Sequence, residues 1–99
     1  MAVGVMLEFD DSVGKSQYDA VNDKLGLDPK AGTGDWPKGL QTHAGGAVDG
    51  GGFVVVETWD SKASQEAFMG SRLGAALGEV GVPAPVRVTW FEVAGQHTV

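Results

Sequence analysis

The sequence predicts an α+β fold with the element order β-α-β-β-α-β. Four short segments are rich in β-branched and aromatic residues, and two longer segments repeat apolar residues at helical spacing. The chain also contains two similar halves. Glu8-Phe9-Asp10-Asp11-Ser12 precedes the first helical segment, and Glu57-Thr58-Trp59-Asp60-Ser61 precedes the second. The repeated strand–helix junction indicates two β-α-β units joined by a hairpin.

The first half begins with a strand over 2–9. Its side chains are mostly apolar at both odd and even positions, so we expect both faces of the strand to be covered. The polar side chains of Asp10–Ser12 are suited to cap a helix. A helix is expected over 13–25 because its apolar residues recur on one face. Gly26 lies where a left-handed glycine commonly ends a helix.

A long connection and a hairpin follow. Residues 28–39 contain three glycines and two prolines and are therefore expected to form a loop, which carries Trp36. Strands are expected over 40–48 and 53–59. The intervening segment 49–52 is Asp-Gly-Gly-Gly, which favours a tight turn because glycine adopts positive φ without steric cost.

The second half closes with a helix and a strand. The helix is expected over 61–80, with Asp60 or Ser61 as its cap and Gly81 as its end. The last strand is expected over 86–93.

Glycines recur every fourth residue along one face of the second helix, at Gly70, Gly74 and Gly78. Each costs up to about 1 kcal/mol relative to alanine within a helix. We expect either close packing of the helix backbone on the sheet or a break near Gly70. The six residues 94–99 are expected to be frayed.

This element order is that of the ferredoxin-like fold, with two helices on one face of a four-stranded antiparallel sheet. We expect residues 1–99 to form a single domain. The second sheet face is also expected to be apolar, and one chain has nothing left to cover it. Two sheets packed face to face in a homodimeric α/β barrel would bury it. The alternative is a monomer with an exposed apolar face.

Composition excludes several classes of function. The formal net charge is −6, so binding to nucleic acid or to an anionic membrane is not expected. The chain has no cysteine, which excludes disulfides, thiolate nucleophiles and iron–sulfur clusters. It has two histidines, His43 and His97, without the spacing of a metal site, so neither a metal nor another cofactor is expected. We predict a cytoplasmic protein, because no basic leader precedes the first apolar segment.

His43 and Glu57 are the candidate catalytic residues. His43 lies within a strand among small residues, and histidine is the usual acid or base near neutral pH. Glu57 interrupts an apolar strand and must be paired, hydrated or functional. The two oppose each other if paired residue numbers sum to 100, whereas a sum of 101 turns Glu57 to the other face. The alternative for Glu57 is a salt bridge to Arg87, and for His43 a structural hydrogen bond.

Four further residues are the candidate ligand-binding set. Trp59 and Trp90 lie late in their strands and are either pocket walls or core, and Trp36 is either a lid or a plug in a partner subunit. Gln41, in the same strand as His43, completes the set.

The chain resembles the dimeric α/β-barrel superfamily, which includes antibiotic-biosynthesis monooxygenase-like proteins, over about residues 2–93. The resemblance is carried by Glu8-Phe9, Gln17-Tyr18-Asp19, Gly39-Leu40-Gln41-Thr42-His43, Val55-Val56-Glu57-Thr58-Trp59-Asp60-Ser61, Phe68 and Gly81-Val82-Pro83. It implies a homodimer that binds a small aromatic or apolar molecule. The implied activities are cofactor-independent oxygenation, isomerisation or cyclisation. The alternative is a non-catalytic dimeric carrier or stress-associated module.

Overall fold

Four strands form one antiparallel sheet in the order β4-β5-β1-β6, as the sequence predicts. The structure is a computed structural model that describes residues 2–97. The strands are β1 (Val3–Phe9), β4 (Leu40–Ala47), β5 (Phe53–Trp59) and β6 (Arg87–Glu92). The two central strands are therefore the apolar segments of the two halves, and the predicted ferredoxin-like topology is confirmed.

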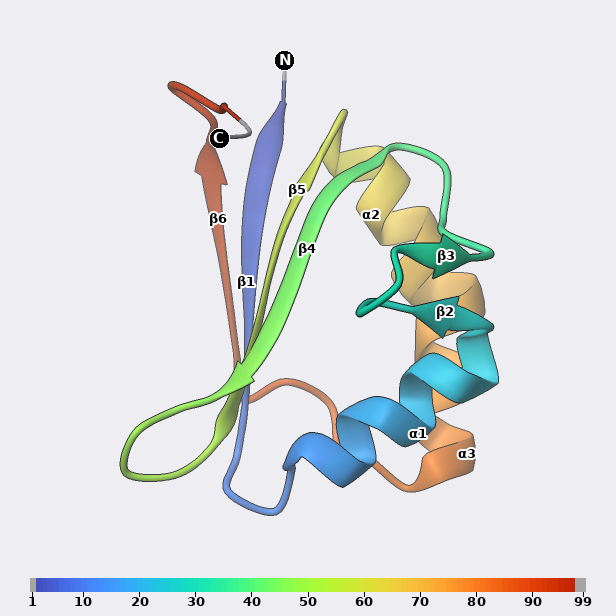
Figure 1. Cartoon of the computed structure of the whole chain (residues 1–99). Helices are drawn as coiled ribbons and strands as arrows, with labels where there is room; N and C mark the ends of the chain where they lie inside the picture. Colours follow the sequence, from blue (N-terminus) through green and yellow to red (C-terminus); the bar gives the residue numbers. More distant parts are fainter. Residues whose placement is uncertain (1, 98–99) are drawn as a thin grey trace.

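The helices all lie on one face of this sheet (Figure 1). They are α1 (Lys15–Leu25), α2 (Lys62–Phe68) and α3 (Gly74–Val80), with a π-helical turn, η1 (Met69–Leu73), joining α2 to α3. The predicted helix over 61–80 is thus present, but it widens into a π-helical turn in its middle. This turn contains Gly70, near which the sequence predicts either a break or close packing. At Gly74 a Cβ atom would lie 2.8 Å from the carbonyl oxygen of Met69. Glycine allows this close backbone approach.

Helix α1 starts two residues later than predicted. Asp10 does not cap it, because the Asp10 carboxylate accepts the backbone N–H of Ser12 at 2.8 Å and closes a local turn. Gly14 precedes the first helical residue instead, and Gln17 Oε1 accepts the Gly14 N–H at 2.9 Å. The predicted ends hold: Gly26 (φ 73°) and Gly81 (φ 82°) adopt left-handed conformations after α1 and α3. Ser61 is the cap of α2 and accepts the N–H of Ser64.

The long connection is more ordered than the predicted loop. It contains a short antiparallel pair, β2 (Leu27–Asp28) and β3 (Thr33–Gly34), which lies beside the helices (Figure 1). The Arg72 guanidinium donates to the carbonyl oxygens of Leu25 and Asp35, at 3.0 and 2.7 Å. These two hydrogen bonds hold both ends of the connection against η1 and so position Trp36.

The core lies between the sheet and the helices. Val5, Leu7 and Trp59 are its most completely buried large side chains. They come from alternate positions of the central strands, as expected when one face of a strand packs against helices. The helices contribute the remaining buried apolar side chains, which include Val21, Leu25, Phe68, Ala76 and Leu77.

The opposite sheet face carries apolar side chains that none of the helices within residues 2–97 covers (Figure 1). Met6 and Val54 are half-buried, whereas Val56 and Phe91 are 38% and 47% exposed. The Phe91 ring lies across Gly4, where a Cβ atom would overlap it. The sequence predicted that these strands carry apolar side chains on both faces of the sheet, and the structure shows them on both faces.

Within residues 2–97, no helix is long and apolar enough to cross a membrane. The predicted frayed tail begins after β6 at residues without regular structure, and the Gln96 side chain donates to Thr58 Oγ1 at 3.2 Å. The end of that tail, 98–99, lies outside the described residues.

Candidate functional site

The pairing of β4 with β5 places His43 directly opposite Glu57. Of the two registers that the sequence allowed, the structure adopts the one in which paired numbers sum to 100. Gly50, Gly51 and Gly52 all have positive φ and close the turn between these strands. An irregularity between Leu40 and Thr42 then shifts the register at the far end, so that Leu40 pairs with Trp59. Both His43 and Glu57 consequently face the helices.

His43 and Glu57 form a buried hydrogen-bonded pair. His43 Nδ1 lies 2.7 Å from Glu57 Oε2, and their side chains are 11% and 6% exposed. Trp59 Nε1 donates to the other carboxylate oxygen, Oε1, at 3.2 Å. Because a carboxylate only accepts hydrogen bonds, neutral His43 carries its proton on Nδ1. The alternative ion pair between Glu57 and Arg87 does not form, since Arg87 lies 3.6 Å from Glu8 on the opposite face.

Tyr18 extends this pair into a chain of three residues. Its hydroxyl is hydrogen-bonded to His43 Nε2, and its ring lies nearly parallel to the imidazole, with an interplanar angle of 9°. With the proton on Nδ1, Nε2 accepts and the Tyr18 hydroxyl donates. Tyr18 was named from the sequence only among the residues that carry the family resemblance and was not assigned to the site. Its position on the same face of the predicted helix as Val21 and Leu25 was the available signal.

The surroundings of Tyr18 keep its phenol protonated. Burial raises the pKa of Tyr18 above its ordinary value of 10, and the nearby negative charges of Glu57 and Asp19 act in the same direction. The Asn22 carboxamide opposes this rise in the pKa of Tyr18. Tyr18 is therefore a proton donor at neutral pH, and its deprotonation depends on transfer to His43.

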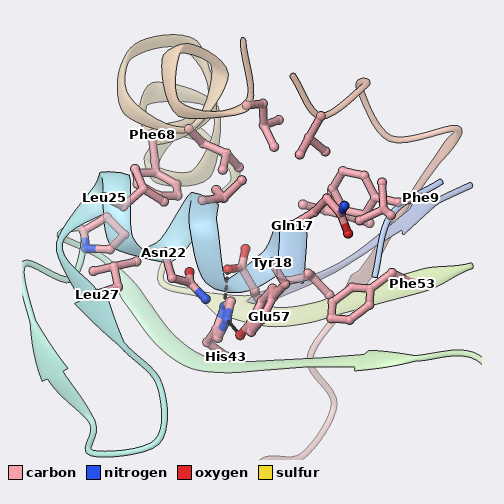
Figure 2. A pocket seen from close by; sticks show the side chains of 18 of the residues that line it. Phe9, Gln17, Tyr18, Asn22, Leu25, Leu27, His43, Phe53, Glu57 and Phe68 are labelled. Atoms are coloured by element: carbon pink, nitrogen blue, oxygen red, sulfur yellow. Dashed lines mark hydrogen bonds and ion pairs between the residues drawn. The ribbon is translucent and has the colours of Figure 1, made fainter. Parts of the chain in front are cut away.

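The three residues Tyr18, His43 and Glu57 line a cavity of about 60 Å³ between the sheet and the helices (Figure 2). The rest of its wall is mostly apolar and includes Leu7, Phe9, Val21, Leu25, Leu27, Phe53, Val55, Phe68, Leu73 and Leu77. A larger open groove of about 770 Å³ runs between α1 and β4. The cavity and the groove share Tyr18, Asn22, Leu27, His43 and Phe53, so the two hollows adjoin at the hydrogen-bonded chain.

The four predicted ligand-binding residues have different surroundings. Trp36 lines the cavity, and its ring packs against His43 with centroids 5.4 Å apart. Gln41 is exposed and borders a shallow depression of about 280 Å³ that it shares with Trp36 and His43. Trp59 is fully buried and Trp90 lies beneath the Lys62 ammonium, 5.0 Å from its ring centroid. Neither of these two tryptophans lines the cavity.

Asn22 is a second residue that sequence reasoning did not assign to the site. It follows Tyr18 by one helical turn, is 5% exposed and lines the cavity. Its carboxamide forms the side-chain hydrogen bond with Tyr18 that acts to lower the pKa of that phenol. Its spacing of four residues from Tyr18, on one face of the predicted helix, was the sequence signal.

No cluster of three or more histidine, aspartate or glutamate side chains that could hold a metal ion occurs in the described part of the chain. The hydrogen-bonded chain of Tyr18, His43 and Glu57 is suited to proton transfer at the wall of an apolar cavity.

Comparison with solved structures identifies several proteins of the same fold. Rv0793 from Mycobacterium tuberculosis is 21% identical, with a TM-score of 0.68 and coverage of 99% of this chain and 100% of that one. A protein named as a candidate antibiotic biosynthesis monooxygenase from Chloroflexus aurantiacus is 14% identical, with a TM-score of 0.66 and coverage of 99% and 98%. A dimeric ferredoxin-like protein of unknown function from Thermobifida fusca is 22% identical, with a TM-score of 0.51 and coverage of 91% and 86%.

No protein-family model matches the sequence, and no curated protein matches it. The structural neighbours are antibiotic-biosynthesis monooxygenase-like and ferredoxin-like α/β proteins, as the resemblance of the sequence predicts. At these identities the similarity establishes the fold and leaves the chemistry to be argued from the site.

Proposed function

We propose that the protein is a cytoplasmic homodimer that binds a small aromatic or apolar molecule and transfers protons to and from it without a cofactor. The observation that carries this proposal is the hydrogen-bonded chain Tyr18–His43–Glu57 at the wall of an apolar cavity. Burying an imidazole, a carboxylate and a phenol together costs free energy that apolar side chains in the same place would not cost, which favours a functional role for the three groups.

The geometry supports one direction of proton flow. A proton leaves a carbon or oxygen of the ligand for Tyr18 Oη, while the phenol proton passes to His43 Nε2. The ligand keeps the electron pair and becomes an anion, and His43 becomes an imidazolium. The Glu57 carboxylate, 2.7 Å from His43 Nδ1, stabilises that positive charge. Oxygenation, isomerisation and cyclisation of an apolar metabolite can each begin with this step.

The homodimer is supported by the apolar sheet face that carries Met6, Val54, Val56 and Phe91. A second copy packed on this face would remove these side chains from water and form the two-sheet barrel. The similar fold of the Thermobifida fusca protein, which is described as dimeric, adds to this support.

One observation favours the alternative of a non-catalytic dimeric carrier or structural module. The cavity of about 60 Å³ is smaller than the few hundred Å³ typical of ligand pockets. On that alternative the hydrogen-bonded chain serves only to satisfy buried polar groups.

Hydrogen–deuterium exchange of a carbon acid separates the two functions. 2-Indanone, an apolar bicyclic ketone with acidic C–H bonds, is incubated with the protein in D₂O and followed by NMR. The acid–base proposal expects faster exchange than in buffer, and a loss of at least about tenfold in His43→Gln. His97→Gln is the matched control, because His97 is exposed and lies in the tail.

Exchange at the buffer rate with wild-type protein would contradict the acid–base proposal and favour the carrier. Equal acceleration by wild type, His43→Gln and His97→Gln would show that catalysis does not pass through His43.

The homodimer has its own test by native mass spectrometry. We expect wild type at twice the chain mass and Val56→Asp at the monomer mass, because a carboxylate would be placed in the centre of the apolar face. Val86→Asp is the control, since Val86 is 66% exposed and lies immediately before β6. A wild-type monomer would contradict the barrel.

A further inference from the structure

The segment 27–38, which connects α1 to β4, borders three hollows that meet at His43 (Figure 1). Leu27 and Trp36 line the closed cavity, and Leu27 and Pro29 line the open groove. Pro29 and Trp36 also line the shallow depression described above. A movement of this segment away from the core would therefore join the three hollows.

The segment is held in place by little apolar packing and lies between two glycines. Residues 28–35 are all exposed, which is typical of a part of a protein that opens locally. Gly26 and Gly39 flank the segment and have positive φ, of 73° and 94°. Residues at the ends of elements commonly absorb the backbone rotation of a hinge. The two glycines are therefore suited to be the hinges of the segment.

Hydrogen bonds within the segment keep it together as one body. Its two short strands, β2 and β3, pair with each other. The Gly32 N–H donates to the Asp28 carbonyl oxygen at 2.8 Å, and Trp36 Nε1 donates to the Thr33 carbonyl oxygen at 3.0 Å. The indole that packs on His43 is thus fastened to the segment, and it would leave His43 when the segment moves.

Arg72 fastens the segment to the helical layer. Its Nη2 donates to the Leu25 carbonyl oxygen at 3.0 Å, which anchors the guanidinium on the end of α1. The same nitrogen donates to the Asp35 carbonyl oxygen at 2.7 Å, and this hydrogen bond holds the segment. The Asp35 carboxylate is 84% exposed, so its ion pair with Arg72 contributes little. Arg72 lies in η1, and π-helical turns occur frequently at functional sites.

The closed arrangement leaves a cavity too small for most ligands. Its volume of about 60 Å³ compares with the few hundred Å³ typical of ligand pockets. Leu27, which is 7% exposed, and Trp36 form part of its wall. Moving the segment outward would add the adjoining groove to this space and expose Leu27.

We propose that the segment 27–38 is a gate over the cavity, that it turns as one body about Gly26 and Gly39, and that Arg72 is its latch. The inference rests on the proposed function for the molecule that enters, and it specifies how entry to that site is controlled. Arg72 acts through the gate and takes no part in the proton transfer itself.

The gate has a closed and an open state. In the closed state, Arg72 holds Trp36 against His43, and the gate keeps bulk water from the hydrogen-bonded chain. In the open state, a minor population, the hydrogen bond from Arg72 to the gate is broken and Leu27 faces solvent.

A single introduced thiol reports the open state, because the chain contains no cysteine. In Leu27→Cys the thiol is buried in the closed state, and its alkylation by iodoacetamide is followed by mass spectrometry. Val5→Cys is the matched control, since Val5 is 0% exposed within β1 and its thiol reacts only when the whole fold opens. We expect Leu27→Cys to react at least about tenfold faster than Val5→Cys. Low concentrations of urea should accelerate only Val5→Cys, because the gate exposes little surface.

Arg72→Met keeps the apolar stem of the side chain and removes its donors. It should accelerate alkylation of Leu27→Cys by about tenfold, because the closed state loses a charge-assisted hydrogen bond that the open state lacks. Asp35→Asn should change this rate by less than about twofold, since the ion pair is exposed. Ser61→Ala removes the cap of α2, outside the gate, so it should accelerate Val5→Cys by about fivefold and leave Leu27→Cys unchanged.

Equal alkylation of Leu27→Cys and Val5→Cys, rising together with urea, would overturn the gate and leave the hydrogen-bonded chain in place. A rate of Leu27→Cys that Arg72→Met does not change would overturn the latch. With the gate opening as expected, 2-indanone should slow alkylation of Leu27→Cys by occupying the closed site. No slowing would contradict the proposed ligand class and leave the gate standing.

Discussion

The two halves of the molecule repeat the same strand–helix junction, yet they use its glutamate in opposite ways. Glu57 of the second half faces the helices, is 5% exposed and is bonded to His43 and Trp59. Glu8 of the first half faces the open side of the sheet, where Arg87 lies 3.6 Å away. The same residue type thus belongs to the candidate site in one half and to the surface in the other.

The difference arises from strand parity. In β1 the helix-facing positions are Val5, Leu7 and Phe9, so the glutamate beside Phe9 faces away. In β5 the helix-facing set includes both Glu57 and Trp59. Because side chains alternate between faces, a shift of one residue relative to the junction moves a carboxylate from solvent to core. Both copies of the junction therefore form a strand that leads into a helix, but only the second copy contributes its glutamate to the candidate site.

The largest expected effect is on stability, from removing each glutamate in turn. Glu57→Ala should lower the free energy of unfolding by about 3 kcal/mol, because it leaves the buried donors of His43 and Trp59 unpaired. Glu8→Ala should cost less than about 1 kcal/mol, as for an exposed ion pair. Urea unfolding at pH 7 and one protein concentration measures both. Similar losses in the two variants would contradict the assignment of Glu57 alone to a buried network.

Neighbouring glycines of β4 provide a second comparison, between its two faces. A Cβ atom at Gly45 would lie 2.6 Å from the Tyr18 ring, whereas one at Gly46 would meet nothing within 4 Å. Gly45→Ala should cost about 1–2 kcal/mol and move Tyr18 away from His43. Gly46→Ala should be neutral or stabilise by up to about 0.5 kcal/mol. Thermal unfolding compares them, and a Gly46→Ala loss as large as that of Gly45→Ala would contradict this packing.

The smallest expected effect is a shift in the titration of Tyr18, the only tyrosine in the chain. Burial raises the pKa of Tyr18 above 10, so the folded state holds its proton more tightly than the unfolded state does. The associated stability is present below pH 10 and is lost as the pH rises through the folded-state pKa. Phenolate absorbance measures this midpoint. Asn22→Leu should raise the midpoint further, because Asn22 opposes the shift; a midpoint below that of free tyrosine would contradict the burial of Tyr18.

The sequence predicted the strands and the fold well because local signals set them. The glycines at Gly26 and Gly81 and the apolar run of β5 are visible without tertiary information. The late start of α1 and the short β2–β3 pair were missed, since Asp10 forms a competing local turn and Arg72 acts from a distant helix.

The site was predicted only in part. His43 and Glu57 were identified as isolated polar residues within strands, but their contact depended on the register that the turn between β4 and β5 decides. Tyr18 and Asn22 come from α1, and only the packing of that helix on β4 brings them to His43. The spacing of a single sequence places these two residues on one face of the helix, but it does not show which strand residue they contact.

The most direct test of the account is the protonation of the His43 ring, read by long-range ¹H–¹⁵N NMR at pH 8 in the His97→Gln background. The account predicts neutral His43 with its proton on Nδ1 and an unprotonated Nε2 whose signal moves in Tyr18→Phe. A proton on Nε2 would mean that Tyr18 does not donate to His43 and would contradict the proposed relay.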